Sequence, residues 1–138
     1  GGVSPILLDG KVILAGDGDN QSFLAAMDAD TGKVLWKVDR INVKAAFSTP
    51  CEFTDPAGTR GLVFNSMGHG ITFLDPSTGK TLWEQDGVFD KRSVSSSLVA
   101  EGLLIGTCGS GGGGNYLVAV KPGSAADGGA PFRESWFS

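Results

Sequence analysis

The chain has 138 residues, a length that suits one domain or part of a larger one. Its 22 glycines and 6 prolines make up about a fifth of the residues, against ~12% on average, so long helices are disfavoured and an all-β fold with tight turns is expected. Eleven basic residues against 15 acidic ones exclude a general nucleic-acid binder, and no apolar run is long enough for a membrane-spanning helix.

The first residues, Gly1–Pro5, contain neither the charged nor the apolar segment of a secretory leader, so we expect a mature or excised segment rather than an intact precursor. Strand-sized segments then follow one another, separated by turn signals such as Asp9-Gly10 and Glu101-Gly102. Consecutive short hairpins predict antiparallel meanders. In chain order the predicted strands are 5–8, 12–15, 23–27, 34–38, 50–53, 62–65, 71–74, 81–85, 96–99, 103–107, 116–120 and 134–137.

An internal repeat organises these strands. The segment Asp28–Trp36 recurs as Asp75–Trp83 with an offset of 47 residues, and a divergent third copy runs from Ala119 to Trp136. A period of this length with four strands in each copy is typical of a β-propeller blade. The sequence therefore predicts three four-stranded antiparallel blades in one domain, at about 1–40, 41–88 and 89–138.

The repeated turn has a local physical explanation. Asp28 or Asp75 can accept hydrogen bonds from backbone N–H groups two or three residues further on. Gly32 or Gly79 then supplies the positive φ that closes the hairpin with a bulge. The tryptophan four residues later is large and carries one N–H group that needs a partner, so we expect it to pack between neighbouring blades. These residues are interpreted as structural.

The first copy, with Ala26, Asp28, Thr31, Gly32 and Trp36, resembles the tryptophan-docking motif of the PQQ-like (quinoprotein dehydrogenase-like) β-propellers. In that family the indole stacks on the glycine peptide of the adjacent blade and donates to the carbonyl at the alanine position of the motif. The resemblance covers almost the whole chain and is specific for the fold, not for an activity.

The other copies of the motif depart from the family pattern to different degrees. The second copy has Phe73 where the family usually has alanine, and otherwise keeps the pattern in Asp75, Thr78, Gly79 and Trp83. By resemblance, Trp36 would dock on the turn around Gly79 and on the carbonyl of Phe73, and both Trp36 and Trp83 would be largely buried. The third copy keeps Ala119 and Trp136 but has Lys121 in place of the aspartate.

Three blades cannot close a ring, because propellers have about four or more. The resemblance therefore implies a partial ring, a segment of a seven- or eight-bladed propeller, whose partners are other blades of the parent propeller or a second copy of the chain. Two copies could close a ring of six blades. Apolar residues at the open faces, including Leu7, Ile13 and the surfaces around Gly32 and Phe137, would then favour association.

Candidate chemical residues are few. Cys51 and Cys108 lie at a strand start and a strand end one blade apart, which leaves both a cross-blade disulfide and two buried free thiols open. His69, the only histidine, has no ligand partner at a suitable sequence spacing, so metal binding or base catalysis is not favoured. The segments Asp17–Gln21 and Gly109–Asn115 superficially resemble calcium and phosphate loops but are interpreted as hairpin loops.

Two functions remain open. The favoured one is a non-catalytic propeller segment that serves as a scaffold or protein-interaction surface, with no catalytic, cofactor-binding or metal-binding residues of its own. By resemblance to the outer-membrane assembly propeller, the location would be the bacterial periplasm or the outside of the cell. The alternative is a fragment of a quinoprotein alcohol or sugar dehydrogenase, which would use PQQ and calcium; adjacent cysteines over the cofactor, a feature of such enzymes, are absent from the sequence.

Overall fold

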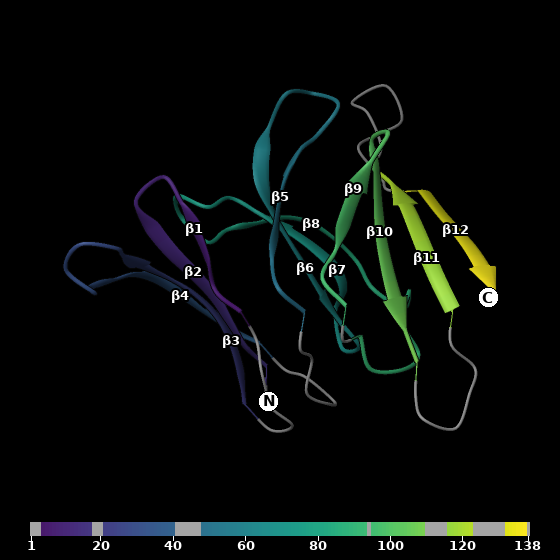
Figure 1. The fold of residues 1–138 in the computed structure, drawn as a ribbon, viewed down its shortest axis with the longest axis horizontal. Coiled ribbons are helices and arrows are strands. Elements are labelled where there is room, and N and C mark those ends of the chain that lie inside the picture. Colours follow the sequence, from purple (N-terminus) through teal and green to yellow (C-terminus); the bar gives the residue numbers. More distant parts are fainter. Residues whose placement is uncertain are drawn as a thin grey trace.

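The computed structural model describes residues 4–17, 21–40, 48–93, 95–109, 116–122 and 132–137. Within these ranges, twelve strands form three four-stranded sheets and no helix is present. Each sheet is an antiparallel meander in which consecutive strands pair, and the three sheets follow one another across Figure 1 in sequence order. The expected all-β, three-blade architecture of a partial propeller is confirmed.

Each sheet is called a blade from here on. Blade 1 consists of β1 (Ile6–Leu8), β2 (Lys11–Asp17), β3 (Ser22–Asp28) and β4 (Val34–Arg40). Blade 2 consists of β5 (Cys51–Thr54), β6 (Arg60–Ser66), β7 (Gly70–Leu74) and β8 (Thr81–Gln85). Blade 3 consists of β9 (Leu98–Ala100), β10 (Leu103–Cys108), β11 (Tyr116–Lys121) and β12 (Phe132–Phe137). Every predicted strand is present, although several start or end one or two residues away from the expected positions.

Two of the inner hairpins are closed by residues with positive φ. Asp9 and Gly10 have φ values of 49° and 72°, and Glu101 and Gly102 have φ values of 51° and 74°. A two-residue loop with both φ angles positive is the turn whose twist matches that of the flanking strands. The same turn geometry therefore joins the first two strands of blade 1 and of blade 3.

Cross-strand pairing defines two sides of each blade. One row of paired residues runs across each sheet from its first strand to its fourth, and we call the side that carries this row the forward face and the other side the backward face. The rows are Ile6, Ile13, Ala26 and Trp36 in blade 1; Cys51, Val63, Phe73 and Trp83 in blade 2; and Leu98, Ile105, Ala119 and Glu134 in blade 3.

The hydrophobic core lies between the blades. The first interblade core packs the forward face of blade 1 against the backward face of blade 2, and its buried members are Leu8, Ile13, Ala15, Leu24, Ala26, Trp36, Leu62, Phe64 and Leu74. The second interblade core packs the forward face of blade 2 against the backward face of blade 3, and its buried members are Phe53, Val63, Ile71, Phe73, Val88, Phe89, Leu104, Cys108, Val118 and Val120. Both faces of blade 2 are therefore covered, which explains why almost every residue of β6 and β7 is buried.

The two outermost faces differ from these interiors. On the backward face of blade 1, Leu7 is 71% exposed and Val12 and Leu14 are only half-buried. On the forward face of blade 3, Leu98 is 64% exposed and Ile105 is half-buried. The expectation that Ile13 belongs to an open face was wrong: its side chain is fully buried in the first interblade core, because its pairing with Ala26 places it on the forward face.

Candidate functional site

The two copies of the repeated turn adopt the same backbone structure. In the first turn, Asp28 N–H donates to Lys33 O over 2.8 Å and Gly32 N–H donates to Asp28 O over 2.9 Å. In the second turn the corresponding bonds, Asp75 N–H to Lys80 O and Gly79 N–H to Asp75 O, are both 2.8 Å. The pairing register shifts in the strand before each turn, between Ala26 and Met27 and between Phe73 and Leu74, which is the bulge that the positive φ of each glycine accommodates.

The aspartate side chain closes the turn from inside. Asp28 Oδ1 accepts from the backbone N–H groups of Asp30 and Thr31, each over 2.9 Å, and Asp75 Oδ1 accepts from Ser77 N–H over 2.8 Å. The bonds from the Thr31 and Asp30 N–H groups stabilise the charged carboxylate and lower the pKa of Asp28. The expected Asx-type turn therefore exists in both copies.

The indole of Trp36 crosses from blade 1 to the turn of blade 2. A Cβ atom placed on Gly79 would lie 2.6 Å from Trp36 Cε3 and 2.7 Å from Cδ2, so the ring lies directly on the glycine peptide. Trp36 Nε1 donates to the carbonyl of Pro76 over 2.8 Å, and the side chain is only 8% exposed. The expectation that the carbonyl of Phe73 accepts this hydrogen bond was wrong. Phe73 lies within β7, whereas Pro76 belongs to the turn itself.

Only glycine fits under this ring. Gly79 has φ of 76°, which disfavours any other residue, and it is buried under the indole. Through this one side chain the contact connects Trp36 to Pro76, which lies 40 residues further along the chain. It thereby fixes the position of β4 relative to the turn between β7 and β8.

The second and third tryptophans of the repeat are placed differently. Trp83 is half-buried rather than largely buried; its ring packs on Phe73 of its own blade with a centroid distance of 5.3 Å. In blade 3 the register places Glu134, not Trp136, opposite Ala119, and Trp136 pairs with Leu117. The third copy therefore departs from the motif by two cross-strand pairs. The side chain of Trp136 lies outside what the structure describes.

A charged contact lies beside the first interblade core. Arg60, at the start of β6, contacts Asp9 of the β1–β2 turn, with Nη1 to Oδ2 at 2.7 Å, and also contacts Glu52 of β5. The hydrogen bonds that Arg60 donates to Glu52 and to Asp9 raise the pKa of Arg60, which stays charged in any case. Blade 1 and blade 2 are thus linked on their surface as well as through their core.

The two cysteines are free thiols, and both contribute to the second interblade core. Burial raises the pKa of the Cys51 thiol to about 11, which keeps it protonated at neutral pH. The Cys108 thiol lies 4.0 Å from Asp90 Oδ1. Of the two alternatives for the pair, the structure contains free thiols, and the neutral Cys51 acts as a small apolar residue.

His69 has a carboxylate neighbour that its sequence surroundings do not reveal. Its Nδ1 lies 3.1 Å from Glu84 Oε1, and Thr72 Oγ1 donates to Glu84 Oε2 over 2.8 Å. Thr72 pairs with Glu84 across β7 and β8. This pairing brings Glu84 next to His69, although the two lie 15 positions apart in the sequence. The contact could have been predicted from the sequence only through the pairing of the two strands of this hairpin. The other ring nitrogen of His69, Nε2, is buried, although the side chain as a whole is 24% exposed.

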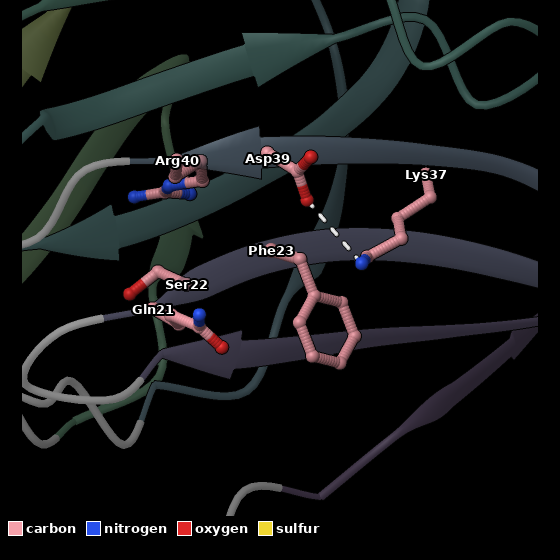
Figure 2. A pocket seen from close by; sticks show the side chains of 6 residues that line it. All are labelled: Gln21, Ser22, Phe23, Lys37, Asp39 and Arg40. Atoms are coloured by element: carbon pink, nitrogen blue, oxygen red, sulfur yellow. Dashed lines mark ion pairs between the residues drawn. The ribbon is translucent and has the colours of Figure 1, made fainter.

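A shallow hollow lies at one end of blade 1 (Figure 2). Its volume is about 460 Å³ and it is lined by Gln21, Ser22, Phe23, Lys37, Asp39 and Arg40. Lys37 Nζ lies 3.3 Å from Asp39 Oδ1 and 5.0 Å from the ring centroid of Phe23. Arg40 Nη2 donates to Ser66 Oγ of blade 2 over 2.6 Å. The charged groups of the hollow therefore already have partners within the protein: Lys37 contacts Asp39 and Phe23, and Arg40 binds Ser66 of blade 2.

No group of three or more histidine, cysteine or acidic side chains that could hold a metal ion occurs among the described residues. Those residues also include no helix long and apolar enough to cross a bilayer. The loops interpreted at Asp17–Gln21 and Gly109–Asn115 fall mostly outside the described ranges, at 18–20 and 110–115, and remain predictions.

Repeated four-stranded sheets, packed face to face and joined by a tryptophan that lies on the glycine turn of the next sheet, define the class of PQQ-like β-propeller repeats. Residues 1–125 match the family model described as outer membrane protein assembly factor BamB, and the chain belongs to this PQQ-like repeat family. A search of curated proteins gave no match.

Proposed function

We propose that the chain is a non-catalytic segment of a PQQ-like propeller that serves as a scaffold and protein-interaction surface, in the bacterial periplasm or outside the cell. The family description, an outer membrane protein assembly factor, supports a role in contacts between proteins. One observation carries the proposal: the most specific motif of the sequence is used to join two blades, with Trp36 on Gly79 and Pro76.

The described residues do not fit PQQ and calcium. Calcium takes six to eight oxygen ligands, and no acidic cluster of the required kind occurs in the described ranges. The Trp36 ring already lies on Gly79 and the Trp83 ring against Phe73, so each indole serves a contact within the propeller. We therefore derive no redox chemistry from these residues, and the motif is proposed to be structural throughout.

The test is cofactor binding by the purified chain. After incubation with PQQ and calcium and removal of excess cofactor, we expect no quinone absorbance and no dye-linked oxidation of alcohols or sugars. The urea-unfolded chain serves as the control, since lysine amines can form non-specific adducts with the quinone. Stoichiometric, saturable PQQ binding by the folded chain, above the level of this control, would overturn the scaffold proposal in favour of a dehydrogenase fragment.

A further inference from the structure

A buried polar side chain faces blade 3 from the middle blade. Asn65 lies on β6, two residues after the row residue Val63, so its side chain belongs to the forward face of blade 2. It is 2% exposed, and neither its Nδ2 nor its Oδ1 atom has a hydrogen-bond partner among the described residues. An amide enclosed in this way is unfavourable unless something inside the protein satisfies its hydrogen bonds.

The amide of Asn65 lies against blade 3. A Cβ atom placed on Gly106 would be 2.8 Å from Asn65 Nδ2, so the amide nitrogen lies over this glycine. Gly106 follows the row residue Ile105 on β10 and therefore faces blade 2. The ring of Phe89 lies on the same glycine, with its Cζ atom 2.7 Å from that Cβ position. The place is thus enclosed by an aromatic ring as well as by the two sheets.

A second buried polar group lies next to Gly106. The pairing register of β9 with β10, continued by one residue, places Ser97 opposite this glycine. The two segments stay together beyond this point, since Thr107 N–H donates to Ser95 Oγ over 3.2 Å. Ser97 is 4% exposed, and its hydroxyl forms no hydrogen bond of normal geometry among the described residues. Its side chain faces blade 2, because it lies near the Cys51 thiol and counters part of the effect of burial on the thiol pKa.

The equivalent place in the first interblade core is apolar. Counted from the row residues, Ala15 of β2 stands at the position of Asn65, and Phe64 of β6 stands at the position of Gly106. Both are buried members of that core. In the second interface, an amide and a glycine therefore stand where the first has a methyl group and a phenyl ring. The same place is polar in one interface and apolar in the other.

The two unpartnered groups require a ligand that both donates and accepts hydrogen bonds. Asn65 offers donors at Nδ2 and an acceptor at Oδ1, and the Ser97 hydroxyl offers both functions. A metal cation would leave the amide N–H groups unpaired, and an anion would leave the amide oxygen unpaired. Water satisfies both, and globular proteins hold about one buried water per 27 residues, each bound by about three hydrogen bonds.

We propose that a water molecule is bound between blades 2 and 3, held by the side-chain amide of Asn65 and the hydroxyl of Ser97 beside Gly106. This water joins the two blades through hydrogen bonds at the place where the first interface relies on apolar contact. The inference goes beyond the proposed function and does not depend on it, because the site would be the same in a scaffold and in a dehydrogenase fragment.

A crystal structure of the full chain, at a resolution that shows ordered water, is the first test. We expect a water within about 2.7–3.2 Å of both the Asn65 amide and the Ser97 hydroxyl. The variant Asn65→Leu keeps a side chain of similar size but removes both polar atoms, and its crystal structure should lack this water. Absence of the water in the wild type, or a direct hydrogen bond between Asn65 and Ser97 in its place, would overturn the proposal.

A double-mutant cycle tests the same site in solution. Asn65→Ala and Ser97→Ala are made separately and together, and urea denaturation gives each unfolding equilibrium constant. If one water binds both groups, the effect of the double variant should differ by at least about threefold from the product of the single effects. Circular dichroism checks that the sheets are intact, and if a variant fails to fold, the wild-type crystal structure still decides.

Thr72→Val is the matched control for the cycle. It removes a hydroxyl that is also buried, 2% exposed, but that lies on the backward face of blade 2 and is bonded to Glu84. Combined with Asn65→Ala, it should be additive. Additive effects of Asn65→Ala and Ser97→Ala would overturn the proposal, because two groups on one water must be coupled. Coupling without the water in the crystal structure would overturn it as well, since the two side chains would then interact directly.

Discussion

The two interblade cores are filled by different aromatic side chains at equivalent places. In the first, the side chain of Trp36 extends from β4 onto the turn of blade 2, and Arg60 connects the two blades at the surface nearby. In the second, the residue at the same row position, Trp83, stays half-buried on Phe73. Phe89, from the connection after blade 2, fills the interface instead and lies against Gly106 of blade 3.

The difference shows that the repeat specifies the blade more strictly than it specifies the contact between blades. Phe73 replaces the small Ala26 of the first copy, and its ring lies beside Trp83 and Phe53. A Cβ atom on Gly61 would collide with the ring of Phe73, so the β6 residue beneath the ring has to be small. Each aromatic residue thus limits the size of its neighbours.

The largest expected effect is the loss of an indole, and it separates the two cores. Trp36→Ala should lower the free energy of unfolding by about 3–5 kcal/mol, because a buried ring and its hydrogen bond to Pro76 are both removed. Trp83→Ala should cost roughly half as much, since its ring is only half-buried. Urea denaturation followed by circular dichroism measures both values.

Equal losses for the two variants would contradict this comparison, because they would mean that Trp83 docks as tightly as Trp36. The variant Trp36→Phe is the useful control. It keeps an aromatic ring on Gly79 but removes the N–H donor, so its cost relative to Trp36→Ala divides the contact into stacking and hydrogen bonding.

The next effect compares the two turns. Gly79→Ala and Gly32→Ala both place an alanine at positive φ, which costs about 1–2 kcal/mol at either site. At Gly79 the methyl group also displaces the indole, so we expect a further loss of about 1–3 kcal/mol that Gly32→Ala does not show. Unfolding of both variants at low protein concentration, where self-association does not contribute, gives the difference directly. A difference near zero would show that the ring can shift away from Gly79 without loss.

Contacts between residues close in sequence were predicted well, and contacts between blades were predicted less well. The hairpins follow from local chemistry, since turns such as Asp9-Gly10 and the segment Asp28–Lys33 select their own backbone conformation. The repeat then gives the number of blades and their order, because each copy must place the same apolar row on the same face. The predicted strands, their pairing order and the all-β class were accordingly correct.

Contacts between blades were predicted less well, because they depend on side-chain volumes that the repeat does not fix. The docking of Trp36 near Gly79 was expected from the resemblance, but the acceptor was not, since a shift along the turn selects the carbonyl of Pro76. The packing of Trp83 on Phe73, and the pairing of β12 that puts Glu134 opposite Ala119, were likewise not predicted. Glu84 beside His69 required the exact pairing of β7 with β8.

A smaller effect distinguishes the first strands of the two rows. Blade 2 carries the titratable Cys51 where blade 1 carries Ile6, and burial raises the thiol pKa to about 11. An unfolded thiol has a pKa of about 8.5, so the folded state holds the proton more tightly. The resulting stabilisation is complete below about pH 8.5 and is lost as the pH rises through about 11.

Comparison of the wild type with Cys51→Val between pH 7 and pH 11 tests this dependence, because all other titrating groups are common to both chains. We expect the stability of the wild type to decline more steeply over this interval. In parallel, iodoacetamide at pH 8 should label Cys51 at least ~100-fold more slowly in the folded chain than in urea, as site-resolved mass spectrometry can show. Equal labelling rates would mean that the thiol is exposed and its pKa ordinary.

The smallest expected effect concerns the surface link that only the first interface has. Arg60 contacts Asp9 and Glu52, but the side chains of all three are roughly half exposed, between 44% and 56%. Water and salt therefore screen the attraction, and Arg60→Gln should shift the urea midpoint only slightly at physiological salt. Because screening weakens at low ionic strength, the shift should grow when the salt is lowered to about 10 mM, where the Debye length is roughly 30 Å. Lys37→Gln, which removes an ion pair with Asp39 within one blade, is the matched control and should respond to salt no more strongly. A large shift at 1 M salt would instead show that Arg60 stabilises the interface by packing its side-chain stem, and the first core would then extend to the molecular surface.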